Sequence, residues 1–178
     1  MHDASRQSAH SAPIDVATVR QLFAHPARCA GSQFLRREIS ARMQERLSLI
    51  KLAPQRILDA GCGEGRDLLP LQQRYPQAQL LGIDASVPML QLASAASRVT
   101  RTALQNLFAK VIGSDRLTSP DTLLGCADFA HMPLATRSVD LLWSNLALHW
   151  HPKPHAVLAE WARVLRTDGL LMFSCFGP

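Results

Sequence analysis

The sequence predicts an α/β fold in which helices pack on both sides of a mostly parallel sheet. Three observations support this prediction. An apolar run that ends in an acid, residues 57–59, leads into alternating glycines at positions 61, 63 and 65, as where a buried strand turns sharply into a helix. A second apolar run, residues 79–84, ends in an acid 19 residues after the last of these glycines. Strand-like and helix-like segments then alternate as far as residue 174.

Length and composition limit the class of protein. With 178 residues, 47% of them hydrophobic, the chain can bury one core but not two. No apolar run is long enough to span a membrane, and the polar start lacks the apolar segment of a secretory signal. The cysteines are scattered and form no C-x-x-C pair, so neither a disulfide framework nor a metal site is expected. We therefore expect a cytoplasmic protein that binds no metal.

The region before the first strand is expected to hold a flexible tail over residues 1–13 and a helical cap over residues 14–52. Residues 14–24 show helical spacing. On residues 32–52 the apolar residues follow one helix face: Phe34, Leu35, Ile39, Met43, Leu47 and Ile50. The arginines lie on its other sides: Arg36, Arg37, Arg42 and Arg46. Residues 1–56 contain nine Lys and Arg against four Asp and Glu, so this helix is either a solvated basic surface or a docking surface for an acidic partner.

The remaining elements belong to a domain expected over residues 53–178. A helix is expected over residues 66–75, with its start shifted by Pro70. The later strands are expected at residues 79–84, before Asp128, from residue 138 and at residues 170–176. Residues 97–122 are long for a simple connection and predict an insertion, with an extra helix over residues 102–112. Because the last strand would be a bare sheet edge, we expect the chain to be a shortened version of a longer protein.

The acids beside the glycine turn indicate the kind of ligand. In a dinucleotide site the pyrophosphate lies over this turn, and Asp59 would repel it. Arg66 also stands where the dinucleotide pattern needs its third glycine or alanine. A ligand with a cationic end suits the turn better, and S-adenosylmethionine carries a sulfonium and an ammonium. Asp84 follows the second strand at the spacing of an acid that accepts hydrogen bonds from a ribose, although it could instead be a helix N-cap.

Residues 59–65 resemble motif I of the class I S-adenosylmethionine-dependent methyltransferases. Residues 125–134 resemble the third motif of that family, and residues 138–150 resemble its fourth strand and the loop beneath the ligand. The resemblance implies a Rossmann-like three-layer sandwich with an N-terminal helical cap. It also implies the residues that bind S-adenosyl-L-methionine: Asp59, Gly61, Gly63, Gly65, Asp84, Ala85, Met89, Asp128, Phe129, Asn145 and Leu146. In that family the acid corresponding to Asp128 binds the adenine amino group, and its apolar neighbour contacts the ring.

Within the class, the sequence is most similar to the malonyl-[acyl-carrier protein] O-methyltransferases of biotin synthesis. The similarity is carried by residues 34–39, 57–63, 85–90 and, most specifically, 143–150. It implies methylation of the free carboxylate of a malonyl thioester, with the acidic acyl-carrier protein bound on the basic helix of residues 32–52. Two alternatives remain open: a methyltransferase for another small molecule such as a quinone precursor, or a non-catalytic nucleoside-binding module like some assembly factors. No nucleic-acid or membrane partner is expected.

A catalytic side chain is not evident in the sequence. A carboxylate acceptor is already ionised near neutral pH and needs no general base. His149 is the candidate base if the acceptor is a hydroxyl or a carbon acid, and otherwise a residue that shapes the pocket. The group His149, His151 and His155 is a poor metal site, because Pro152 and Pro154 break any helix that would align the three rings.

Overall fold

The computed structural model describes residues 14–98 and 122–177. The expected tail over residues 1–13 and the helix and loop expected within residues 102–121 lie outside the described residues. The described elements are, in order, α1 (Val16–Phe23), the 3₁₀ helix η1 (Pro26–Ser32), α2 (Gln33–Ser48), β1 (Arg56–Ala60), α3 (Leu68–Arg74), β2 (Gln79–Asp84), a helix over residues 87–98, β3 (Leu123–Cys126), β4 (Val139–Asn145), the 3₁₀ helix η2 (Leu148–Trp150), α5 (Pro154–Val164) and β5 (Leu165–Ser174).

The strands form one sheet in the order β3-β2-β1-β4-β5, and each neighbouring pair runs parallel. Strand β1 lies in the middle, where Leu58 is opposite Leu81 of β2 and Leu142 of β4. The α/β fold with a parallel sheet is thus confirmed. In such sheets ligands bind beyond the carboxyl ends of the strands, at the point where the strand order reverses. Here that point lies between β1 and β4.

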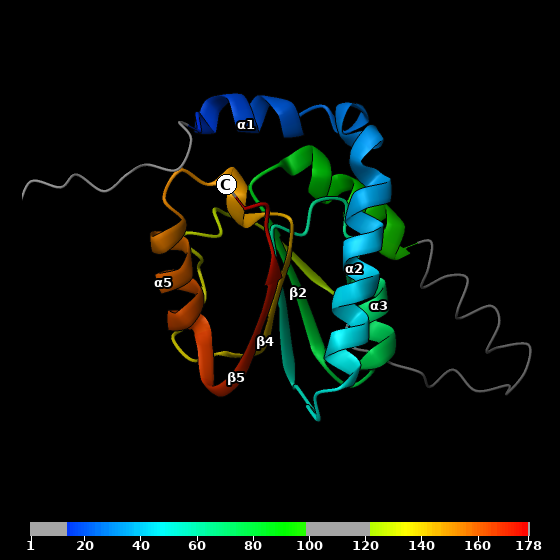
Figure 1. The fold of residues 1–178 in the computed structure, drawn as a ribbon, viewed down its shortest axis with the longest axis vertical. Helices are drawn as coiled ribbons and strands as arrows, with labels where there is room; N and C mark the ends of the chain where they lie inside the picture. The colour runs from blue at the N-terminus through cyan, green and yellow to red at the C-terminus, as the bar shows by residue number, and fades with distance from the viewer. Residues whose placement is uncertain (1–13, 99–121, 178) are drawn as a thin grey trace, which may run out of the picture.

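Helices cover both faces of the sheet and one end of it (Figure 1). Helix α5 lies on one face, where Trp161 and Val157 pack with Leu58 and Leu142. Helices α2 and α3 lie on the other face. There the buried cluster comprises Met43, Leu47, Ile57, Leu68, Leu71, Ala78, Leu80, Leu141 and Trp143. Burying a single Val, Leu or Ile side chain contributes about 1.5–3 kcal/mol, so the two clusters fix the sheet between its helices. Helix α1 crosses over the carboxyl ends of the strands (Figure 1).

Only some of the apolar residues that the helical spacing places on one face of α2 are buried. Met43 and Leu47 are buried, but Phe34 is 72% exposed, and Leu35 and Ile50 are exposed as well. The N-terminal part of α2 extends past the strand ends toward α1 (Figure 1), so its first turn has no sheet to pack against. The expectation that Phe34 and Leu35 belong to the buried face is therefore wrong. It is also wrong for Ile50, because α2 ends at Ser48 before that residue.

Three boundaries also differ from expectation. Helix α3 begins at Leu68, so Pro70 lies in the first turn, where a missing N–H breaks no helical bond. Strand β5 begins at Leu165 and bulges in its pairing with β4. Val139 lies opposite Leu165 but Leu141 lies opposite Leu170, so four residues of β5 stand against one residue of β4. The same strand ends at Ser174 rather than at residue 176 and is the edge of the described sheet. No helix among the described residues is long and apolar enough to cross a membrane.

Candidate functional site

The turn after β1 depends on glycine at two positions. Gly61 has a φ of +79°, and a Cβ there would lie 2.5 Å from the Cβ of Ala147. Gly63 has a φ of +53°, and a Cβ there would meet no atom within 4 Å. The first glycine is therefore required by close packing, whereas the second borders open space that a ligand can enter.

The backbone amides of this turn are used within the protein. The N–H groups of Gly61 and Cys62 both donate to the carbonyl of Ile83, at 2.8 and 3.0 Å. The N–H of Gly63 donates to the Asp84 carboxylate at 2.8 Å. These three amides are not free to bind a pyrophosphate, in contrast with the glycine-rich phosphate loops that present theirs to the ligand.

Asp84 joins the turn to the loop after β2. One carboxylate oxygen accepts from Gly63, and the other accepts from the N–H of Ser86 at 2.8 Å. Burial raises the pKa of this carboxyl, and the two backbone hydrogen bonds partly offset that rise. Each oxygen has a second lone pair, so the carboxylate can still accept hydrogen bonds from a ligand in the cavity.

Asp59 lies at the bottom of the same cavity. It is on β1 and only 2% exposed, and no donor among the described residues reaches its carboxylate. Burial raises its pKa well above the usual value, and the neighbouring carboxylates of Asp67 and Asp84 raise it further. A positive ligand group placed here would remove this penalty on the ionised form.

Asp67 is a functional candidate that the sequence did not reveal. Its carboxylate accepts from the indole N–H of Trp143 at 3.0 Å, from the Asn145 amide at 3.1 Å and from the hydroxyl of Ser40. Ser40 belongs to α2 and the other two donors to β4, so this buried carboxylate ties an N-terminal helix to the central sheet. Asp67 occupies the N-cap position of α3 but makes no capping hydrogen bond. Its position before a helix therefore does not indicate its role.

The loop after β3 places Asp128 and Phe129 at the cavity. One Asp128 oxygen accepts from the N–H of Ala130 at 2.8 Å, and the Nε2 atom of His151 lies 4.0 Å from that oxygen. The ring of Phe129 lies 3.7 Å from the Cβ position at Gly61, so it borders the glycine turn. The second Asp128 oxygen accepts no hydrogen bond from a described residue and is available to a ligand.

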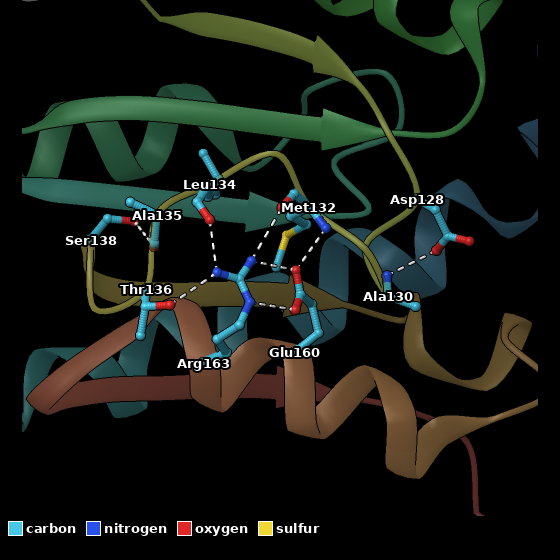
Figure 2. A network of polar contacts seen from close by, with 9 residues as sticks. All are labelled: Asp128, Ala130, Met132, Leu134, Ala135, Thr136, Ser138, Glu160 and Arg163. Atoms are coloured by element: carbon cyan, nitrogen blue, oxygen red, sulfur yellow. Dashed lines mark hydrogen bonds and ion pairs between the residues drawn. The ribbon is translucent and has the colours of Figure 1, made fainter.

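A network on α5 holds this loop in place (Figure 2). Arg163 donates twice to the Glu160 carboxylate, both at 2.7 Å. The same guanidinium donates to the carbonyls of Leu134 at 2.8 Å and Met132 at 3.2 Å, while Glu160 accepts from the N–H of Met132 at 2.7 Å. The hydrogen bonds from Arg163 lower the pKa of Glu160. The Glu160–Arg163 pair thus fixes the backbone that follows Asp128.

Asn145 and Leu146 close the cavity beside the end of β4. The Asn145 amide donates to the carbonyl of Arg36 at 3.0 Å, and its oxygen accepts from the Ser174 hydroxyl at 2.9 Å. Leu146 has a φ of +52°, and its N–H donates to the Ser174 carbonyl at 3.1 Å. A leucine is strained in this conformation, and the bonds from β5 hold it there.

His149 packs at the mouth of the cavity. Its ring lies 4.6 Å from the Phe176 ring and 5.1 Å from the Trp150 ring, centre to centre. Its Nδ1 atom is buried without a hydrogen-bond partner among the described residues, and burial lowers its pKa. Burial thus disfavours the protonated form of this histidine. No group of three metal-ligating side chains occurs among the residues that the structure describes.

These groups surround one cavity of about 590 Å³ between the strand ends and the N-terminal helices. All but one of the expected donor-binding residues line it, together with His149: Asp59, Gly61, Gly63, Asp84, Ala85, Met89, Asp128, Phe129, Asn145 and Leu146. Gly65 does not; a Cβ there would lie 2.8 Å from the Cβ of Ala93, so Gly65 lets the turn pack on the helix over residues 87–98. Arg36 and Arg37, expected on the outer sides of α2, also line the cavity.

Comparison with known proteins agrees with this architecture. A family model described as a methyltransferase domain matches residues 58–173. The malonyl-[acyl-carrier protein] O-methyltransferase of Methylovorus sp. (strain MP688) is 43% identical over 169 residues, which make up 93% of this chain and 52% of the relative. The enzyme of the same name from Laribacter hongkongensis (strain HLHK9) is 46% identical over 144 residues, 81% of this chain and 45% of the relative.

Solved structures also resemble the chain. A chain of the complex that contains the Haloferax volcanii Trm112 methyltransferase activator has a TM-score of 0.61 and 26% identity, and the match covers 88% of the present chain and 58% of that one. The present chain spans about half the length of the curated relatives it matches. The family match covers most of the sheet and the whole glycine turn, and the fold resembles that of the solved structure. The chain therefore belongs to the methyltransferase domain family.

Proposed function

We propose that the chain binds S-adenosyl-L-methionine in this cavity and transfers its methyl group. The observation that carries the choice of ligand is the combination of three carboxylates, Asp59, Asp67 and Asp84, with a glycine turn whose amides are already used. A phosphate would be repelled there and would find few donors, whereas a sulfonium or an ammonium would be stabilised. The open space beside Gly63 fits a ligand lying against bare backbone.

Each polar group has a proposed role toward the ligand. Asp84 accepts from the ribose hydroxyls, the free oxygen of Asp128 accepts from the adenine amino group, and Phe129 contacts the ring. Ala85, Met89 and the backbone at Asn145 and Leu146 complete the lining. Asp59 and Asp67 supply negative charge near the cationic end. Gly61 and Gly65 serve the ligand only indirectly, by letting the turn pack.

We propose that the methyl acceptor is the free carboxylate of malonyl-acyl-carrier protein, in biotin synthesis. The support is the name that the curated relatives share, at up to 46% identity. When bound, S-adenosylmethionine supplies an electrophilic methyl carbon: as the acceptor oxygen bonds to it, the carbon–sulfur bond breaks and the electron pair stays on sulfur. A carboxylate nucleophile carries no proton to remove. The protein's task is then to align the acceptor and exclude water.

His149 has no proton-transfer step in this reaction. Its lowered pKa and its packing between two aromatic rings suit a residue that shapes the acceptor side of the cavity. Replacing it with glutamine is expected to change the Michaelis constant for the acceptor more than kcat. A loss of about 10²-fold or more in kcat, with a pH profile that follows a histidine, would instead assign it as a general base.

Calorimetry with S-adenosylmethionine, followed by methyl-transfer assays, tests the proposed function. Binding of the methyl donor and esterification of malonyl-carrier protein are the expected results. Turnover of quinone precursors but not of malonyl thioesters would refute the proposed acceptor. Donor binding without transfer to either acceptor would indicate a non-catalytic nucleoside-binding module. Capture of NAD or FAD in preference to the sulfonium compound would refute the donor site itself.

We further propose that the acidic carrier protein docks on helix α2. Residues 32–52 contain five basic and two acidic residues, and the helix presents Arg42, which is exposed beside Glu38, and Arg46. Opposite charges on two partners mainly accelerate their association. Replacing Arg42 and Arg46 together with glutamine should therefore raise the Michaelis constant for malonyl-carrier protein and weaken its salt dependence. An unchanged salt dependence would place the docking surface elsewhere.

A further inference from the structure

Most of the charges that line the cavity are separated by side. Its floor is formed by carboxylates at the strand ends and before α3: Asp59, Asp67, Asp84 and Asp128. Glu64 and Arg66 of the glycine turn also line the cavity and pair with each other. Its opposite side is formed by α1, η1 and α2, which contribute four arginines to the lining: Arg20, Arg28, Arg36 and Arg37. No ion pair joins these arginines to the floor carboxylates among residues 14–98 and 122–177. The floor thus suits a cation, and the opposite side suits an anion.

Three of these four guanidinium groups have no partner among the described residues. The side chains of Arg20, Arg28 and Arg37 make no hydrogen bond or ion pair with any described residue. The acid Glu64 forms an ion pair with one arginine of this set, Arg36, at 3.8 Å, and a shorter one with Arg66 at 2.6 Å. Glu64 thus pairs with Arg36 and Arg66, whereas the exposed guanidinium groups of Arg20, Arg28 and Arg37 keep their donors for water or for an anionic ligand.

Arg36 is the one arginine of this set that is held in place. Its terminal nitrogen donates to the carbonyl of Cys29 at 2.8 Å, and its side chain is 21% exposed. Its Nε atom is buried without a hydrogen-bond partner among the described residues. The backbone of the same residue is tied to Asn145 at the end of β4. Arg36 thus stands at a fixed place between the arginine side and the strand end, with donor capacity that the protein does not use.

We propose that Arg36 and Arg37 form a carboxylate-binding site that receives the anionic end of the methyl acceptor, and that this site selects acyl thioesters carrying a free carboxylate. The proposal rests on the proposed function, since it assigns the acceptor side of that cavity. A guanidinium group binds a carboxylate through charge-assisted, planar hydrogen bonds. A carboxylate offers about four lone-pair positions, so an oxygen held by one N–H keeps a lone pair for attack on the methyl carbon.

The site also accounts for release of the product. Esterification removes the negative charge of the acceptor, so the methyl ester loses the charge-assisted part of its interaction with both arginines. Arg20 and Arg28 add positive potential at the cavity mouth without being fixed to any described residue. The acceptor is thereby bound more tightly than the product through the one group that the reaction changes.

Binding of malonyl-carrier protein and of acetyl-carrier protein, measured by calorimetry in the presence of S-adenosylhomocysteine, tests the site. The two probes differ only in the terminal carboxylate, so docking of the carrier protein contributes equally to both affinities and does not affect their ratio. The wild-type chain is expected to prefer the malonyl form by about tenfold or more. Arg36→Gln and Arg37→Gln should each reduce this preference, and Arg36→Lys should restore part of it. Arg56→Gln, which removes the same charge at the start of β1 outside the cavity, is the matched control.

The outcomes separate the site from the proposed function. Equal binding of both probes by the wild-type chain, or a preference unchanged in both glutamine variants, would overturn the carboxylate site. A fall in S-adenosylhomocysteine affinity with an unchanged malonyl preference would show that the arginines bind the donor's own carboxylate, which also overturns it. An arginine-dependent malonyl preference in a chain that transfers no methyl group would support the site and refute only the proposed function.

Discussion

Replacing Asp128 with asparagine separates ligand recognition from folding. One carboxylate oxygen accepts from the N–H of Ala130 at 2.8 Å, and the other is free. Asparagine can keep the first hydrogen bond while presenting an NH₂ group on the free side, where the adenine amino group is proposed to donate. Two donors would then face each other. A hydrogen bond to a charged group contributes about 1.5–3 kcal/mol, so affinity for S-adenosylhomocysteine should fall about 10- to 150-fold.

Calorimetry with two ligands makes the Asp128→Asn test specific. S-inosylhomocysteine carries a carbonyl in place of the adenine amino group, so the variant should lose its preference for the adenosyl compound or reverse it. The thermal midpoint should change by no more than about 2 °C, since the Ala130 amide keeps its acceptor. If the variant binds S-adenosylhomocysteine as tightly as the wild-type chain, the adenine does not lie at Asp128. A large fall in the midpoint would give the carboxylate a structural role.

Three further predictions concern the glycine turn, the floor of the cavity and helix α5. Gly61→Ala should destabilise the fold by about 2–5 kcal/mol in urea unfolding, because the new Cβ overlaps Ala147 at a positive φ. Gly63→Ala places a Cβ that contacts no atom, so it should cost less stability, but it should weaken donor binding. Because the pKa of Asp59 is raised in the free protein, cation binding should release protons and should strengthen as the pH rises through that raised pKa, and Asp59→Asn should abolish that dependence in calorimetry. The lowered pKa of Glu160 stabilises the fold above about pH 4.3, and this contribution is lost as the pH falls through the folded-state pKa. In urea titrations at successive pH values, the Glu160→Gln variant should not show this part of the fall in the free energy of unfolding.

The strands and the glycine turn could be predicted because their signals are local. An apolar run, an acid and alternating glycines specify a strand, a tight turn and a helix within ten residues, and the acids at positions 59, 84 and 128 lie directly after or within strands. Parallel strands bring their carboxyl ends to one edge, so residues far apart in sequence, such as Asp84 and Asn145, were expected in one site and do line one cavity.

The features of the site that the sequence did not predict depend on contacts between segments far apart in the chain. Asp67 looks like a helix N-cap from its neighbours, and only the folded chain shows its donors Ser40 and Trp143. The direction of Arg36 could not be predicted either, because helical spacing gives the angle of a side chain around its axis but not what stands opposite it. Phe34 was assigned to the buried face for the same reason, because the spacing of apolar residues does not show where a helix extends beyond the sheet that it packs against.

The shared carboxylate of Asp67 has a consequence for how ligands enter and leave. Helix α2 is joined to the sheet through Ser40 and through the Asn145 amide, so it cannot swing outward without breaking buried hydrogen bonds. Helix α1 has no buried residues, and Phe23 at its end ties it to the strand ends: the Phe23 carbonyl accepts from Ser86, and the ring packs edge-on against Trp150. Ligands are thus expected to enter and leave beneath α1, which can move about its end at Phe23, while α2 is the fixed side of the opening. Backbone amides in α1 should therefore exchange with deuterium faster than those in α2.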